Sequence, residues 1–144
     1  MSVPPLLIAR AGGERYGLEI AAVREVAPIG DVTPVPSRSL AVRGVMTLRE
    51  RYLSLFSLEA LLTGRMPLRG QAGAAVVVLL GGAELALEVD EVESVVDAGA
   101  TVVAGEGVAG IAARGVCRCG DVLVTLLDSA RLAERVATFV EAAP

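Results

Sequence analysis

Apolar and polar residues alternate along two segments of the chain in the pattern of a half-buried β-strand. Every second residue between Arg15 and Ile20 is apolar, and the same alternation runs from Glu84 to Val89. A period of two turns one face of a strand toward the core and the other toward water. Each segment follows a Gly-Gly pair, which suits a tight hairpin turn because glycine adopts positive φ without a steric penalty. The pattern therefore predicts two similar hairpins.

The two segments are part of a longer internal repeat. Residues 12–26 align without a gap with residues 81–95, and residues 53–57 resemble residues 124–128 more weakly. Two amphipathic strand patterns could converge on similar compositions, but the gapless fit around the paired glycines favours a duplication. The matched identical residues are Gly12, Gly13, Leu18, Glu19, Val23 and Val26, with Gly81, Gly82, Leu87, Glu88, Val92 and Val95.

The remaining segments also predict mostly strands. Two further hairpins are expected, one from Ala41–Leu48 with Tyr52–Phe56 and one from Gly107–Cys119 with Asp121–Leu127. Residues 21–26 and 90–95 each carry an apolar pair at i and i+3, and this spacing predicts one or two helical turns. The polar, glycine-bearing stretch 64–73 predicts a boundary between two units.

Two further helices are expected at the ends of the two units. Ser57 can accept a hydrogen bond from a free backbone N–H and cap a short helix over residues 58–62. Asp128 can cap a last helix in the same way. In that helix an apolar stripe at i, i+4, i+7 and i+8 predicts one buried face, formed by Leu132, Val136, Phe139 and Val140.

These elements predict a mainly β fold made of two small barrels related by the duplication. Each half offers about five short strands, and closing such a sheet removes its exposed edges. The expected organisation is a single domain over residues 1–144, with a first barrel at 1–66, a connecting segment at 67–73, a second barrel at 74–127 and a C-terminal helix at 128–144.

The composition of the chain argues against several classes of function. The chain has 144 residues, is 53% hydrophobic and carries a net charge of −4, and its basic residues are all arginine and scattered. An acidic chain without a basic cluster has no electrostatic footprint for nucleic acid. The longest apolar run, Ala74–Leu80, has the length of a strand, so insertion into a membrane is not expected. With no leader pattern at the start of the sequence, a cytoplasmic location is expected.

The residues that most enzymes use are missing. The sequence has no His and no Lys, which excludes a Ser-His-Asp triad, a Schiff base and a P-loop lysine. Cys117 and Cys119 are expected to be small apolar strand residues rather than a disulfide, because a bridge between i and i+2 is strained. No cofactor and no metal site are predicted. A carboxylate cluster at Glu88, Asp90, Glu91 and Glu93 leaves acid–base chemistry open as an alternative to a solvated face.

Several motifs, taken in order, resemble the CheW-like domain family. They run from about Leu6 to Leu132, nearly the whole chain. Each motif alone is weak evidence for the family, but the motifs in this order, together with the duplication, are specific to it. They comprise the opening at residues 16–20 and 23–26, the T-x-x-P linker at 33–36, the signature G-V-x-N-L-R-G at 44–50, the V-D-x-V at 89–92 and the closing L-D-x-x-x-L at 127–132.

The resemblance implies two SH3-like five-stranded β-barrels and a non-catalytic adaptor in bacterial chemotaxis or a similar pathway. The implied partners are the cytoplasmic tip of a chemoreceptor, which docks between the barrels, and the regulatory domain of a CheA-type histidine kinase, which binds at barrel ends. Assembly into arrays beneath the inner membrane is also implied. The family positions associated with these contacts are Val23, Glu25, Gly44, Thr47, Leu48, Arg49 and Glu50.

Two details of the match to the family's site positions matter most for the predicted contacts. Glu25 and Arg49 stand where the family pairs an acid with an arginine, so we expect a partly buried ion pair between them that joins the helical segment to the hairpin turn. The signature asparagine and final glycine are replaced by Thr47 and Glu50. A glycine at the last position would permit positive φ in the hairpin turn, whereas Glu50 requires strain or a different turn. The departures predict altered partner choice.

Three functions remain open at this point. The first is a coupling adaptor between receptor and kinase. The second is a divergent CheW-like regulatory or competitor module that binds only one partner. The third is a small enzyme that depends on the carboxylate cluster, although the missing His and Lys argue against it.

Overall fold

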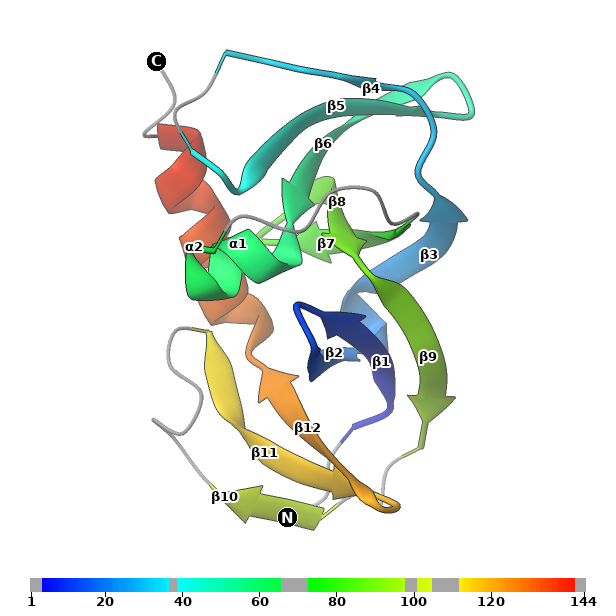
Figure 1. The fold of residues 1–144 in the computed structure, drawn as a ribbon, viewed down its shortest axis with the longest axis vertical. Coiled ribbons are helices and arrows are strands. Elements are labelled where there is room, and N and C mark those ends of the chain that lie inside the picture. The colour runs from blue at the N-terminus through cyan, green and yellow to red at the C-terminus, as the bar shows by residue number, and fades with distance from the viewer. Residues whose placement is uncertain (1–3, 37–38, 66–72, 98–100, 105–111, 142–144) are drawn as a thin grey trace.

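The computed structural model describes residues 4–36, 39–65, 73–97, 101–104 and 112–141. Strands dominate these residues, and they form two sheets that lie one above the other in Figure 1. Sheet A has the order β10 (Thr101–Ala104), β11 (Ala113–Cys119), β12 (Val122–Leu127), β2 (Glu14–Glu19), β1 (Leu6–Ala11) and β9 (Glu91–Val96). Sheet B has the order β3 (Val23–Pro28), β7 (Ala74–Leu80), β8 (Ala83–Val89), β6 (Arg51–Ser57), β5 (Val42–Leu48) and β4 (Val32–Thr33).

The duplication predicted from the sequence appears as one pairing pattern used twice. Leu7 pairs with Val95 between β1 and β9, and the matched Val76 pairs with Val26 between β7 and β3. The parallel pairs also correspond, because β12 joins β2 as β6 joins β8. All four glycines of the two Gly-Gly turns have positive φ, the conformation for which those turns were predicted.

The two halves of the chain exchange their first hairpins. Strands β1 and β2 lie in sheet A with strands from the second half, while β7 and β8 lie in sheet B with strands from the first half. Each sheet is therefore built from both halves, unlike the expected division into barrels at 1–66 and 74–127. The connecting segment 67–73 lies outside the described residues except for Gly73.

The mainly β, SH3-like class is confirmed, but the details of the barrels differ. Each sheet has six strands rather than five, and within the described residues no pairing joins the two edge strands of a sheet. The expected helical turns at 21–26 and 90–95 are wrong: they form β3 and β9, preceded in the first case by a single 3₁₀ turn at Ile20–Ala22. Pairing with β7 and β1 overrides the i, i+3 pattern.

The core is shared by both halves. Its largest cluster includes Leu18, Phe56 and Leu61 from the first half and Leu87 and Leu132 from the second, all buried. Burial on this scale supplies most of the stability of a small domain, at about 25 cal/mol per Å² of apolar surface. The core therefore ties the two sheets together.

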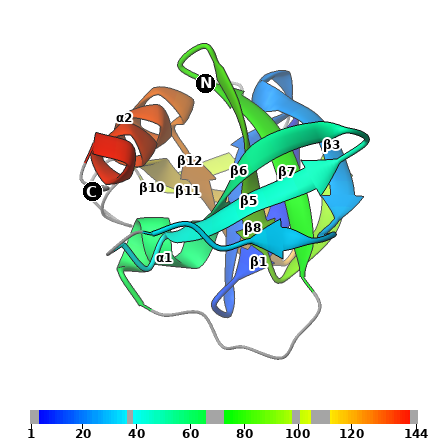
Figure 2. The same ribbon diagram turned by 90° about the horizontal axis from the view of Figure 1, so that it is seen from above.

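Both helices lie on one side of the molecule. Helix α1 (Leu58–Thr63) begins at Ser57, whose hydroxyl accepts a hydrogen bond from the Ala60 N–H at 3.2 Å, as the sequence predicts. Helix α2 (Ser129–Glu141) is capped by Asp128, which accepts from the Arg131 N–H at 3.0 Å. Figures 1 and 2 both show the helices on the side opposite β3. The face formed by β3 and β9 is thus left without a helix.

Candidate partner-binding site

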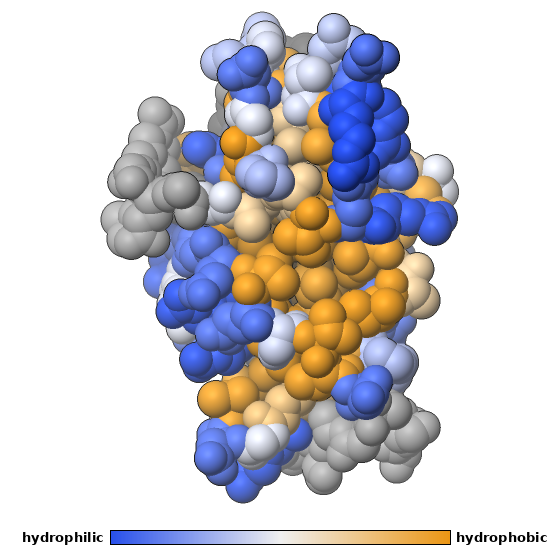
Figure 3. Space-filling model, turned by 90° about the vertical axis from the view of Figure 1, so that its right-hand side faces the viewer, coloured by the Kyte–Doolittle hydropathy of each residue, from blue (hydrophilic) through white to orange (hydrophobic). Residues whose placement is uncertain are grey.

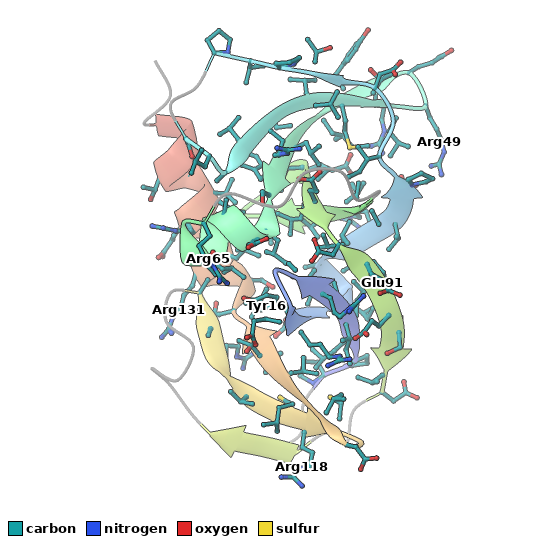
Figure 4. The ribbon with its side chains drawn as sticks, viewed as in Figure 1. Tyr16, Arg49, Arg65, Glu91, Arg118 and Arg131 are labelled. Carbon is teal, nitrogen blue, oxygen red and sulfur yellow. The ribbon has the colours of Figure 1, made fainter. Side chains whose placement is uncertain are left out.

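The β5–β6 turn carries two of the predicted site residues at its tip. Arg49 and Glu50 connect the strands, and both have positive φ, 47° and 68°. Positive φ at both central residues is the pattern of a type I′ hairpin turn, which matches the twist of the strands. The turn thus has the conformation that glycine would favour, although both of its central residues carry side chains that make positive φ sterically unfavourable. Figure 4 shows Arg49 pointing away from the sheets.

The expected ion pair is present beside this turn. Arg49 Nη2 lies 2.8 Å from Glu25 Oε2, and Arg51 Nη2 lies 3.3 Å from Glu25 Oε1. Arg51 also pairs with Glu84. Because 72% of the Arg49 side chain is exposed, its pair contributes less than about 1 kcal/mol to folding. Glu25 belongs to β3, so the pair joins that edge strand to the hairpin turn.

Three other predicted site residues also lie on β5. Thr47 is exposed, and its backbone N–H donates to the Asp31 carbonyl at 3.2 Å. Leu48 is half-buried against the smaller core cluster of sheet B. Gly44 is buried, and a Cβ there would overlap the backbone oxygen of Thr33. Gly44 therefore has a structural reason to be glycine, independent of any partner.

Tyr52 is a large exposed residue that the sequence analysis missed. It pairs with Thr47 across the hairpin, and 76% of its surface is exposed. Leu123, 55% exposed, holds the matched place in the β11–β12 hairpin, where it pairs with Arg118. Each sheet therefore presents one apolar side chain near a hairpin turn. Strand alternation could have shown that Tyr52 faces away from buried Leu53 and Leu55.

Four matched valines lie on the two edge strands, and together we call them the valine patch: Val23 and Val26 on β3, and Val92 and Val95 on β9. Val26 is 44% exposed and Val95 is 60% exposed, while Val23 and Val92 are half-buried against the main core. Figure 3 looks onto the side where β3 and β9 lie and shows an apolar band across its middle. Exposed apolar surface of this kind marks interaction sites in monomers.

The valine patch lies on the two open edges of the sheets. Strand β3 is the last strand of sheet B and β9 the last strand of sheet A. Both carry a register shift, between Val23 and Glu25 on β3 and between Val92 and Ser94 on β9. Such bulges interrupt the ladder and protect an edge against further strand pairing. The side chains of the patch, rather than its backbone, are therefore available for contact.

The carboxylate cluster is held in structural contacts. Glu88 lies 2.9 Å from Arg43 Nε, Glu93 lies 2.7 Å from Arg15 Nε, and Glu91 pairs with Arg10. Burial raises the pKa of Glu88, and Arg43 opposes that shift only in part. Asp90 accepts a hydrogen bond from the Gly12 N–H at 2.9 Å. These side chains link the strands of the fold, which argues against the acid–base alternative.

Other chemistry is not assembled in the part of the chain that the structure describes. No group of three or more potential metal ligands occurs among those residues. Both cysteines are free, as predicted, and burial raises the pKa of the thiol of Cys117 and of Cys119. Thiols with raised pKa are poor nucleophiles at neutral pH. Among the described residues no helix is long and apolar enough to cross a membrane.

Comparisons with known proteins show to which family the chain belongs. A model of the CheW-like domain matches residues 5–137. The chain belongs to the CheW-like domain family. Among solved structures it is similar to the crystal structure of the scaffolding protein TtCheW from Thermoanaerobacter tengcongensis, with a TM-score of 0.75, 20% identity, and 90% of this chain and 91% of that chain covered. The chain matches no curated protein at a significant level. As a member of this family it is a non-enzymatic protein.

The structure does not gather all the predicted site residues of this CheW-like domain at one place. Glu25, Arg49 and Glu50 lie together at the β5–β6 hairpin, whereas Val23 lies in the valine patch and Gly44 is buried. The other patch residues, Val26, Val92 and Val95, are not among the site residues predicted from the sequence. Their repeated Val-x-x-Val spacing is visible in the sequence, where it predicts one or two helical turns rather than an exposed strand.

Proposed function

We propose that this CheW-like domain is a scaffold that couples a chemoreceptor to a CheA-type histidine kinase, with the receptor tip on the valine patch. The observation that carries the proposal is the patch itself. It combines exposed valines from both sheets on a face without a covering helix. An exposed apolar surface of this kind can accept the apolar face of an amphipathic helix.

The surface at the β5–β6 hairpin suits contact with the kinase. The β5–β6 hairpin presents exposed Tyr52 beside Arg49 and Glu50. Tyrosine and arginine are enriched among the residues that contribute most to protein interfaces. Because the matched Leu123 offers an apolar side chain on the other sheet, contacts at both ends would allow extended arrays. The protein would then act in the cytoplasm, beneath the inner membrane.

A competitor module that binds only one partner is the second candidate function. The substitutions of the family signature, Thr47 and Glu50, both lie at the β5–β6 hairpin. In the valine patch, by contrast, Val23 and Val92 stand at positions that match the family motifs. If one contact has been lost, it is therefore the kinase contact, and the receptor contact is retained.

The test is affinity capture from the native lysate with two surface variants. Wild type is expected to recover a chemoreceptor and a CheA-type kinase. Val95→Asp should lose the receptor and keep the kinase, because it buries a charge in the apolar contact. Tyr52→Ala should lose the kinase and keep the receptor, at a cost of about 2 kcal/mol typical of a central interface residue.

Each result separates the alternatives. Loss of both partners by both variants would contradict two distinct surfaces. Recovery of the receptor alone by wild type would favour the competitor module. Recovery of neither partner would contradict the coupling function. Melting curves of the purified variants should match wild type, since both substituted side chains are exposed.

A further inference from the structure

The two halves of the valine patch are copies of each other. Val23 and Val26 match Val92 and Val95 in the repeat, and the pairings of β3 with β7 and of β9 with β1 have the same register. Because each half pairs with the first hairpin of the other, the halves are related by an approximate two-fold axis. An apolar helix placed on the patch would therefore find nearly the same valines in either direction.

The residue at the bulge breaks this equivalence. Arg24 stands between Val23 and Glu25 at the bulge of β3, and Glu93 stands at the matched bulge of β9. Bulges reorient the side chain of the extra residue. The apolar positions of the two halves are thus the same, while the flanking charge is inverted.

The two bulge charges also differ in what surrounds them. Glu93 is neutralised by Arg15 at 2.7 Å and by Arg10 at 3.5 Å, and its side chain is only 25% exposed. Arg24 is exposed and has no ion-pair partner among the residues that the structure describes. On the same strand, Glu25 is already held by Arg49 and Arg51. Within the described part of the chain, Arg24 is therefore an unpaired positive charge beside the valines of β3.

An added strand is the alternative occupant of two open edges, and the bulges argue against it. They interrupt the ladder near the start of β3 and in the middle of β9. A helix needs only the side chains of the patch and can bring a carboxylate to Arg24. The unpaired charge therefore favours a helical partner with an acidic residue at one end of its apolar stripe.

We propose that Arg24 sets the direction of the helix docked on the valine patch by pairing with a carboxylate at the end that lies over β3. This inference rests on the proposed docking function of the patch and adds the residue that determines orientation. Charges at the edge of an apolar contact fix register and exclude wrong arrangements more than they add affinity.

Two synthetic helical peptides test this directly. Both are alanine-based, are about 18 residues long and carry a leucine stripe at i, i+4, i+7 and i+11. One has a glutamate pair in its last turn, and the other has arginines there. Binding is measured to wild type, to Arg24→Glu, and to Arg118→Glu, a matched charge reversal of an exposed arginine on β11, away from the patch in Figure 4.

The expected result is a reversal of preference. Arg24→Glu should lower the affinity for the acidic peptide about tenfold and raise the affinity for the basic peptide by a similar factor. Arg118→Glu should change either affinity by less than about twofold. A nitroxide at the acidic end of the peptide should broaden the amide signals of β3 more than those of β9.

Contrary results separate this inference from the proposed function. If Arg24→Glu behaves like Arg118→Glu, or if the nitroxide broadens β9 equally, Arg24 does not set the direction. If Val95→Asp abolishes binding in the same experiment, the patch remains the docking surface. If neither peptide binds wild type, or if binding survives Val95→Asp, the docking surface is contradicted and the inference falls with it.

Discussion

Gly44 lies where β5 passes close to the backbone of β4. It has a φ of 142°, which residues with side chains rarely adopt, and an added Cβ would overlap the Thr33 carbonyl. The family associates this position with partner contact, yet the glycine is buried. If substitution of Gly44 abolishes partner binding, the first cause to expect is therefore damage to the fold and not the loss of a direct contact.

Gly44→Ala is expected to lower the free energy of unfolding by about 2–4 kcal/mol, since it adds both backbone strain and a steric overlap. Urea unfolding followed by circular dichroism measures this. Gly30→Ala is the matched control, because its Cβ would lie at an ordinary contact distance of 3.5 Å from Thr47 O. Equal stability of Gly44→Ala and wild type would show that the β4–β5 approach can open without cost.

Among the elements, the β5–β6 hairpin keeps a positive-φ turn without a glycine. Arg49 and Glu50 both occupy the left-handed region, which costs about 1–2 kcal/mol for each residue with a side chain. The matched turn of the β11–β12 hairpin begins with Gly120, which has a φ of 63° and carries no such penalty. The first hairpin is therefore strained relative to its copy.

Glu50→Gly is expected to raise the free energy of unfolding by about 0.5–1 kcal/mol, because relief of the turn exceeds the added entropy of glycine in the unfolded chain. Thermal melting monitors the change. Glu50→Ala serves as the control and should show no such gain, since alanine retains the Cβ. Equal effects of the two substitutions would attribute any gain to the lost charge rather than to the backbone.

On the scale of the whole molecule, the exchange of hairpins makes each half depend on the other. Strands β1 and β2 have their further pairing partners in the second half, and β7 and β8 have theirs in the first. An isolated two-stranded hairpin is only marginally stable in water. The core is also shared, around Leu18, Phe56, Leu87 and Leu132, so each half needs the other to bury its apolar side chains.

Fragments covering residues 1–65 and 73–144 are accordingly expected to lack cooperative unfolding when separate and to regain it when mixed. Circular dichroism melts and size-exclusion chromatography of the single and mixed fragments measure this. Cooperative melting of either fragment alone as a monomer would show that a half can fold with its own hairpin. That result would contradict the mutual dependence of the halves.

Local patterns sufficed for much of this fold. The period-two alternation, the Gly-Gly turns and the caps at Ser57 and Asp128 depend on neighbouring residues, so the sequence alone predicted them correctly. The duplication was visible because both copies face the same packing constraints. The pair of Glu25 and Arg49 was expected only from the family resemblance, and the structure contains it.

The rest depends on contacts between distant segments. Residues 21–26 and 90–95 became strands because β7 and β1 offered edges to pair with, which a local i, i+3 pattern does not contain. The exchange of hairpins, the burial of Gly44 and the placement of β3 and β9 as edge strands likewise follow from packing across the chain. The sequence by itself determined the alternating strands, the Gly-Gly turns and the helix caps, since these are set by backbone geometry and local hydrogen bonds. Only the tertiary structure decided which strands pair and which valines stay exposed, because those outcomes depend on residues far apart in the chain.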